Sequence, residues 1–142
     1  MVKLLDAGTS QNASFANSIS IPLSTTPQLF FRHILSTAGA IGTVRSQITG
    51  TVTVQLPLVP VASTITVIIV RGTTPSDPII YSVSEVLDLA IVGPQVLSFT
   101  ASDFNFPLQE NNRVTYTGFI TTSLVGATRV GPESVNATIY SD

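Results

Sequence analysis

The clearest pattern along the chain is an alternation of apolar and polar residues between positions 44 and 56. Five apolar residues share one parity there: Val44, Ile48, Val52, Val54 and Leu56. Arg, Gln and Thr residues occupy the other parity. Successive side chains of a strand point to opposite faces, so the pattern predicts a strand with one buried face. A helix would spread the same apolar residues around its axis.

Seven further segments have strand-like patterns and are separated by turn-forming Gly, Pro and Asn residues. They cover residues 15–23, 29–35, 65–70, 79–89, 96–101, 114–124 and 135–139. The 79–89 segment is irregular, which indicates a bulge or a short helical turn near residues 84–89. Eight short strands at this spacing predict an all-β fold, an eight-stranded jelly-roll-like β-sandwich. Periodicity leaves the strand order open.

Residues 1–14 differ from the rest of the chain. Val2, Leu4 and Leu5 are apolar, and the residues from Asp6 to Ser14 are small or polar. One interpretation is an arm that docks on a neighbouring subunit by adding a strand to its sheet. The other is a frayed terminus or a first strand of the sandwich. We therefore expect a connector arm over 1–14 and a single β-sandwich domain over 15–142.

Composition narrows the classes of partner. Charged residues make up 10% of the chain, against about 25% in typical proteins, and the net charge is −2 with only six Lys and Arg. Nucleic-acid binding needs a basic face, so we expect no nucleic-acid partner. No apolar run reaches the length of a membrane span, and the first residues lack the pattern of a signal peptide. We therefore expect no membrane insertion.

Candidate catalytic and metal-ligating residues are few. His33 is the only histidine and lies within a predicted strand, where a hydrogen-bonded structural role is the simpler interpretation. Glu85 and Asp88 are the carboxylates closest in sequence, but no aromatic sugar platform accompanies them. The run Asp103-Phe104-Asn105 is the nearest approach to a calcium loop and lacks its glycine and later Glu. We expect a protein that is not an enzyme and carries no metal or cofactor.

The outward parity of the best strand consists mostly of Thr and Gln. Soluble monomers usually keep a mixed charged surface, and a neutral surface on β-strands favours pairing between molecules. Hydroxyl groups cost far less to bury at an interface than charges do. These features predict a homopolymer or a large oligomer.

The chain resembles the endospore appendage (Ena-type) pilus subunits of the Bacillus group. The resemblance is architectural and rests on the segment Met1–Ser14, the run Ile48–Val54 and the closing run Val135–Tyr140. It implies a jelly-roll subunit of an extracellular fibre on a spore or cell surface, with copies of itself and a spore-surface anchor protein as partners. Known members cross-link their connectors through cysteines, and this chain has none. The resemblance therefore implies non-covalent docking through Val2, Leu4 and Leu5.

Two other assignments remain open. A viral or phage shell or decoration protein would use the same sandwich in a closed assembly. A trimeric head or carbohydrate-binding module would use it to bind a ligand, although the absence of Trp counts against a sugar site.

Overall fold

The computed structural model describes all 142 residues, and its regular secondary structure consists of β-strands alone. Eight strands are long, and β2 and β9 contain two residues each. The strands are β1 (Lys3–Ala13), β2 (Ile21–Pro22), β3 (Gln28–Ser36), β4 (Val44–Gln55), β5 (Thr64–Arg71), β6 (Ile79–Val86), β7 (Pro94–Phe104), β8 (Arg113–Thr122), β9 (Thr128–Arg129) and β10 (Glu133–Ser141). None of the segments forms a helix capable of crossing a membrane.

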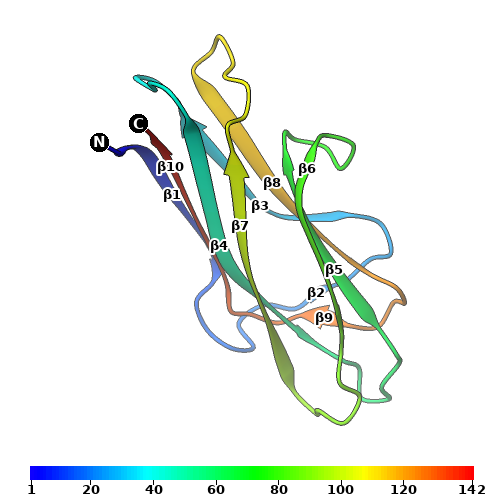
Figure 1. Ribbon diagram of the computed structural model, residues 1–142. Helices are drawn as coiled ribbons and strands as arrows, with labels where there is room; N and C mark the ends of the chain where they lie inside the picture. The colour runs from blue at the N-terminus through cyan, green and yellow to red at the C-terminus, as the bar shows by residue number, and fades with distance from the viewer.

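The strands form two antiparallel sheets that pack face to face (Figure 1). The first sheet places its long strands in the order β1-β10-β4-β7, because β4 pairs with β10 along one edge and β7 along the other. The second has the order β3-β8-β5-β6. Two four-stranded sheets with these orders define a jelly roll, so the predicted fold class is confirmed.

Along one side of β4 the pairing is divided between two strands, β10 and the short β9. Residues 44–51 of β4 pair with β10, and Val54 and Gln55 pair with β9. Between β9 and β10 the chain leaves the sheet through a cis Gly131–Pro132 peptide. Thr53 closes the gap, since its Oγ1 donates to the carbonyl of Pro132 at 3.0 Å.

The core lies between the sheets and consists mostly of inward-facing side chains of β3, β4, β5, β7, β8 and β10. On β4 the apolar parity predicted from the sequence is buried, with Ile48, Val52 and Val54 exposing at most 1% of their surface. Phe30, Phe31 and Phe99 form an aromatic cluster in this layer, with ring centroids 5.1–6.3 Å apart. Gly118 on β8 leaves the space that the Phe31 ring occupies.

The first long strand lies outside the expected segment. Residues 15–23 were expected to form a strand, but only Ile21 and Pro22 pair, and Phe15 is 75% exposed. Asn17 has a left-handed backbone, and Ser18 donates its hydroxyl to the carbonyl of Phe15, which together make a turn. The strand is instead β1, within the segment expected to be a connector arm. In the single chain Lys3–Ala13 pairs with β10, which matches the other interpretation of this segment, a first strand of the sandwich.

Two bulges alter the faces predicted from simple alternation. A register shift between Leu29 and Phe31 turns both Phe30 and Phe31 inward and leaves Leu29 44% exposed. In the irregular 79–89 segment, the shift falls between Ile79 and Tyr81, opposite Ile69 and Val70. The bulge therefore lies at the start of the segment and not near residues 84–89, where β6 continues regularly to Val86 and no helical turn forms. Each inserted residue reverses the parity that follows it.

Candidate assembly surfaces

The three predicted docking residues do not act alike in the structure. Val2 and Leu4 are 61% and 56% exposed. Leu5 packs against the core, because β1 shifts register between Leu4 and Asp6 and turns Leu5 inward. Only Val2 and Leu4 are therefore free to meet another molecule. Val2 borders a shallow depression beside Tyr140 on the outer face.

β1 is an edge strand that buries few of its side chains, as does β6 at the edge of the other sheet. Among its eleven residues only Ala13 is buried. Besides the partly buried Leu5, the strand is held by backbone pairing with β10 and by a few polar contacts, including a 2.7 Å hydrogen bond from the amide of Ser36 to the Asp6 carboxylate. At its other end the Asn12 amide donates to the Phe30 carbonyl at 2.6 Å and to Glu133 at 2.9 Å. The strand thus depends more on hydrogen bonds than on packing.

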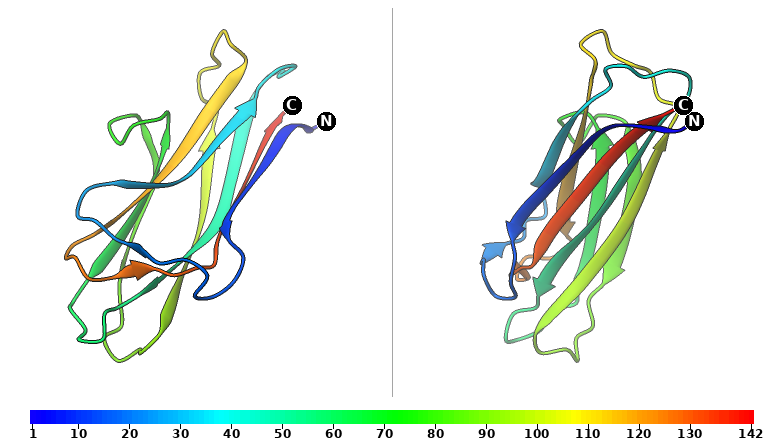
Figure 2. Two further views of the ribbon diagram at one scale, coloured as in Figure 1. Left: turned by 180° about the vertical axis from the view of Figure 1, so that it is seen from behind. Right: turned by 90° about the vertical axis from the view of Figure 1, so that its left-hand side faces the viewer.

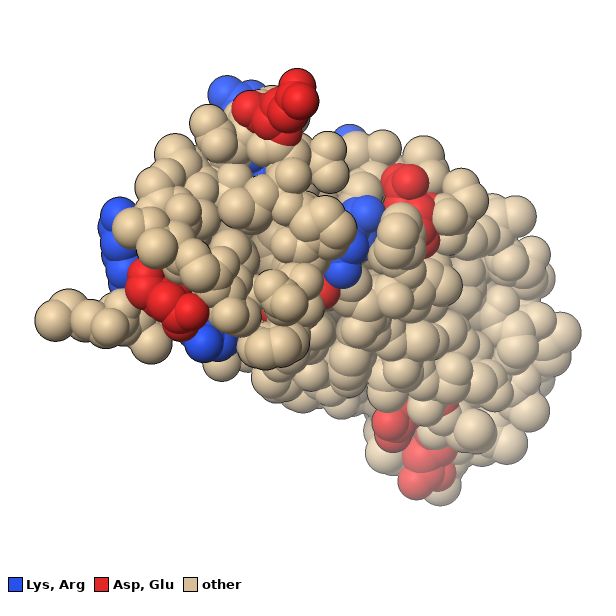
Figure 3. Space-filling view, turned by 45° about the horizontal axis from the view of Figure 1, so that its top comes forward, with Lys and Arg blue, Asp and Glu red and all other residues tan.

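The outer face of the β1-β10-β4-β7 sheet carries an uncharged polar array. Its four strands lie side by side in Figure 2. The register aligns three rows across them: Thr9-Asn136-Thr49-Thr100, Ala7-Thr138-Gln47-Ser102 and Gln11-Ser134-Thr51-Ser98. The next row, at the end that holds the termini, includes Arg45, which pairs with Asp142 at 3.0 Å. Figure 3, in which the top of the Figure 1 view comes forward, shows the charged groups as small patches among uncharged residues.

A polar cluster joins the two sheets at the end of β5, where Arg71 is the last residue of the strand. Asp103 of β7 accepts two hydrogen bonds from the Arg71 guanidinium, at 2.8 and 2.9 Å, and one from the Tyr116 hydroxyl at 2.8 Å. The Ser46 hydroxyl lies 2.9 Å from the Tyr116 oxygen and donates to it, because the single phenolic proton is directed at Asp103. Burial raises the pKa of Tyr116, and the hydrogen bond to Asp103 raises the pKa of Arg71. Asp103 belongs to the run that was compared with a calcium loop, and in the structure its carboxylate binds the guanidinium of Arg71.

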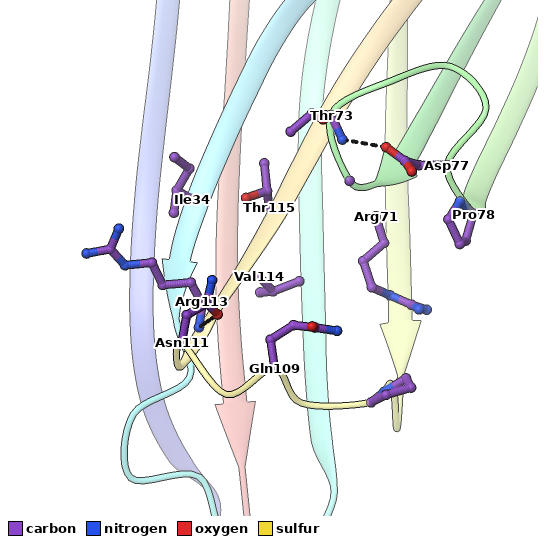
Figure 4. A pocket seen from close by; sticks show the side chains of 12 residues that line it. Ile34, Arg71, Thr73, Asp77, Pro78, Gln109, Asn111, Arg113, Val114 and Thr115 are labelled. Atoms are coloured by element: carbon purple, nitrogen blue, oxygen red, sulfur yellow. Dashed lines mark hydrogen bonds between the residues drawn. The ribbon is translucent and has the colours of Figure 1, made fainter.

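Arg71 also borders a depression of about 570 Å³ (Figure 4). Gln109 lines it from the β7–β8 connection, Arg113 from the start of β8, and Asp77 from the β5–β6 loop. The Asp77 carboxylate accepts the backbone N–H groups of Thr73 and Thr74, which lowers its pKa. Its main partners are in its own turn, so the residue serves to shape the loop.

A second buried ion pair lies at the β9–β10 corner. Arg129 and Glu133 form two charge-assisted hydrogen bonds of 2.5 and 2.6 Å, with side chains 4% and 1% exposed. Gln28 accepts a third bond from Arg129 at 3.2 Å. The sequence analysis missed both ion pairs. The feature that could have indicated them is a charged residue among the inward-facing apolar residues of a strand. On β7, Asp103 shares a face with Phe99 and Ala101.

The other residues considered as catalytic or metal-ligating candidates, His33, Glu85 and Asp88, do not form a common site. His33 is buried, with Nε2 3.2 Å from the Val135 carbonyl, and burial lowers its pKa. The neutral ring therefore donates from Nε2 to this carbonyl. Glu85 and Asp88 are exposed, and Asp88 accepts the backbone N–H of Ala90. No group of three or more His, Cys, Asp or Glu side chains is placed to hold a metal ion.

Comparison with known proteins assigns the chain to no family. No family model matches the chain, and no curated protein matches it. Among solved structures, it is similar to a chain from the naturally occurring empty particles (top component) of Cowpea mosaic virus. The identity is 12%, the match covers 92% of this chain and 89% of that chain, and the TM-score is 0.35. A similarity of this degree carries no argument about function.

Proposed function

We propose that the protein is a structural subunit of a self-assembling fibre on a spore or cell surface, in which β1 of one copy pairs with β10 of the next. The observation that carries the proposal is the weak side-chain anchoring of β1, which buries only Ala13 among its eleven residues. The location and the fibre follow the resemblance drawn from the sequence. Copies of the chain are the principal partner, and an anchor protein would attach the fibre.

Exchange of β1 between copies has a small net energetic cost. The donated strand would form the same backbone bonds with β10 of the acceptor that it forms within its own chain. Exchange of an identical element is a low-cost route to association for this reason. Residues 14–20 connect β1 to β2 and would span about 24 Å when extended, which allows β1 to reach an adjacent molecule.

The uncharged outer face favours close approach of neighbouring subunits. Three rows of four residues carry no charge, so a molecule packed on this face loses no hydrated ion. Hydroxyl and amide side chains keep hydrogen-bonding capacity for the neighbour. This surface supports a polymer whose subunits also stack side by side.

Cysteine cross-linking tests strand donation directly, because the natural chain contains no cysteine. Thr9 of β1 faces Asn136 of β10. Facing residues of antiparallel strands lie about 4.5–5.5 Å apart, within the range that a disulfide bridges. The variant T9C/N136C is purified reduced, allowed to assemble, oxidised and separated on a non-reducing denaturing gel. Donation produces a ladder of covalently linked chains.

The matched control is T49C/T100C, which joins β4 to β7 in the same row of the sheet. It should yield single chains in every state, since neither strand is exchanged. Single chains from oxidised T9C/N136C fibres would refute donation of β1. Closed shells, or monomers at every concentration, in negative-stain microscopy of the natural chain would refute the fibre.

A further inference from the structure

Three loops gather at the end of the sandwich away from the chain termini (Figure 1). They join β4 to β5, β6 to β7, and β8 to β9, and cover residues 56–63, 87–93 and 123–127. The amide of Leu87 donates to the Ser63 carbonyl at 3.0 Å, which ties the first two loops together. A Cβ atom on Gly126 would touch Val61 and Pro57, so the third loop packs on the first.

Each loop presents at least two large apolar side chains to solvent, and Val61 and Ile91 add a third, less exposed one to the first two loops. Leu58 and Val59 are 97% and 82% exposed, Leu89 and Val92 are 48% and 92% exposed, and Leu124 and Val125 are 50% and 67% exposed. We call these six residues the apolar end. Buried residues anchor the same loops, since Leu56, Leu87 and Ala127 belong to the core. The exposed side chains are therefore additional to those that the fold buries.

The apolar end has the apolar character and the restricted backbone of an interface. Its six residues are each about half exposed or more, and they lie on three loops of which the first contacts the other two. Exposed apolar residues that are grouped rather than scattered singly mark interaction sites on soluble proteins. Pro57 and Pro60 flank Leu58 and Val59 and restrict the backbone, which lowers the entropy lost on binding.

The charge distribution favours a second copy of the same chain as the occupant. Asp88 is the only charged residue in the three loops. Its carboxylate accepts the N–H of Ala90, while its backbone amide donates to Gln95. A partner that recognises charge would have only the Asp88 carboxylate to bind at this end. A second copy of the apolar end would cover the apolar side chains, and Asp88 of each copy is the only ion that the contact could bury.

We propose that the apolar end is an interface between copies, in which like ends meet. The inference rests on the proposed function only in that the chain associates with itself. It uses side chains at the end opposite Met1 and Val2, so it is independent of β1 donation. The two contacts together would allow each subunit to bind neighbours through different surfaces.

The test separates the two contacts by locking β1 within its own chain. T9C/N136C is oxidised in dilute solution, and its single-chain form is isolated, which blocks donation. Sedimentation velocity over a concentration series should then show a species of twice the 15.0 kDa chain mass. Adding L58K and V92K places two charges in the contact and should raise the dissociation constant at least tenfold.

The matched control adds F104K, because Phe104 is 69% exposed at the opposite end of β7. It should associate as the locked parent does. Association unchanged by L58K/V92K, or a locked chain that stays monomeric, would overturn the inference. A monomer that floats with phosphatidylcholine vesicles would assign the apolar end to a lipid surface instead. None of these results alters the cross-linking ladder, which reports donation of β1 alone.

Discussion

The two buried ion pairs allow one quantitative prediction about what stabilises the sandwich. Glu133 accepts hydrogen bonds from Arg129 and Asn12, and Asp103 accepts them from Arg71 and Tyr116. Each carboxylate thus meets one bidentate arginine and one further donor. E133Q and D103N remove the negative charge and keep the shape.

The two substitutions differ in what happens to the arginine left behind. Arg129 is only 4% exposed, so its charge stays buried without a partner in E133Q. Arg71 is 27% exposed and can turn its guanidinium toward water in D103N. Removing one member of a fully buried pair costs about 3–5 kcal/mol. We expect E133Q to lie in that range and D103N to cost about 1–3 kcal/mol, nearer the cost of unpaired hydrogen-bonding groups.

Urea denaturation followed by far-ultraviolet circular dichroism measures both values. E85Q is the matched control, because Glu85 is exposed and makes no ion pair; its effect should stay within about 0.5 kcal/mol. The reasoning would be refuted if D103N destabilised the protein as much as E133Q does. It would also fail if E133Q cost less than about 1 kcal/mol, since the pair would then contribute little to the fold.

Two further predictions concern the core. Burial lowers the pKa of His33, so the unfolded chain gains a proton below about pH 6.5 that the folded chain excludes. Stability should therefore be complete above that pH and fall below it, by at most about 1.4 kcal/mol per pH unit, and H33Q should remove this slope in urea midpoints measured at pH 7 and pH 5. A Cβ atom in G118A would overlap the Phe31 ring, and we expect a loss of about 1–3 kcal/mol in thermal denaturation. G93A meets no atom within 4 Å and should be nearly neutral; equal losses in both variants would contradict the packing argument.

The placement of the first strand shows where sequence periodicity is insufficient. Phe15, Ile19, Ile21 and Leu23 alternate as a strand does, yet the turn at Asn17 prevents them from pairing. Lys3–Ala13 has little apolar alternation and forms an eleven-residue strand. An edge strand can form with few buried side chains, because its neighbour supplies the backbone partners.

The sequence by itself determined the all-β class, the approximate positions of seven long strands and the buried face of β4. These follow from local alternation, which depends only on the geometry of a strand. Tertiary structure alone decided the strand order, the inward turn of Phe30 and Leu5 at bulges, and the pairing of Arg71 with Asp103 across the two sheets. It also decided which apolar residues stay exposed, since Leu56 and Leu58 differ only in where the loop leaves the core. Long-range pairing sets these features, and one-dimensional periodicity carries no information about it.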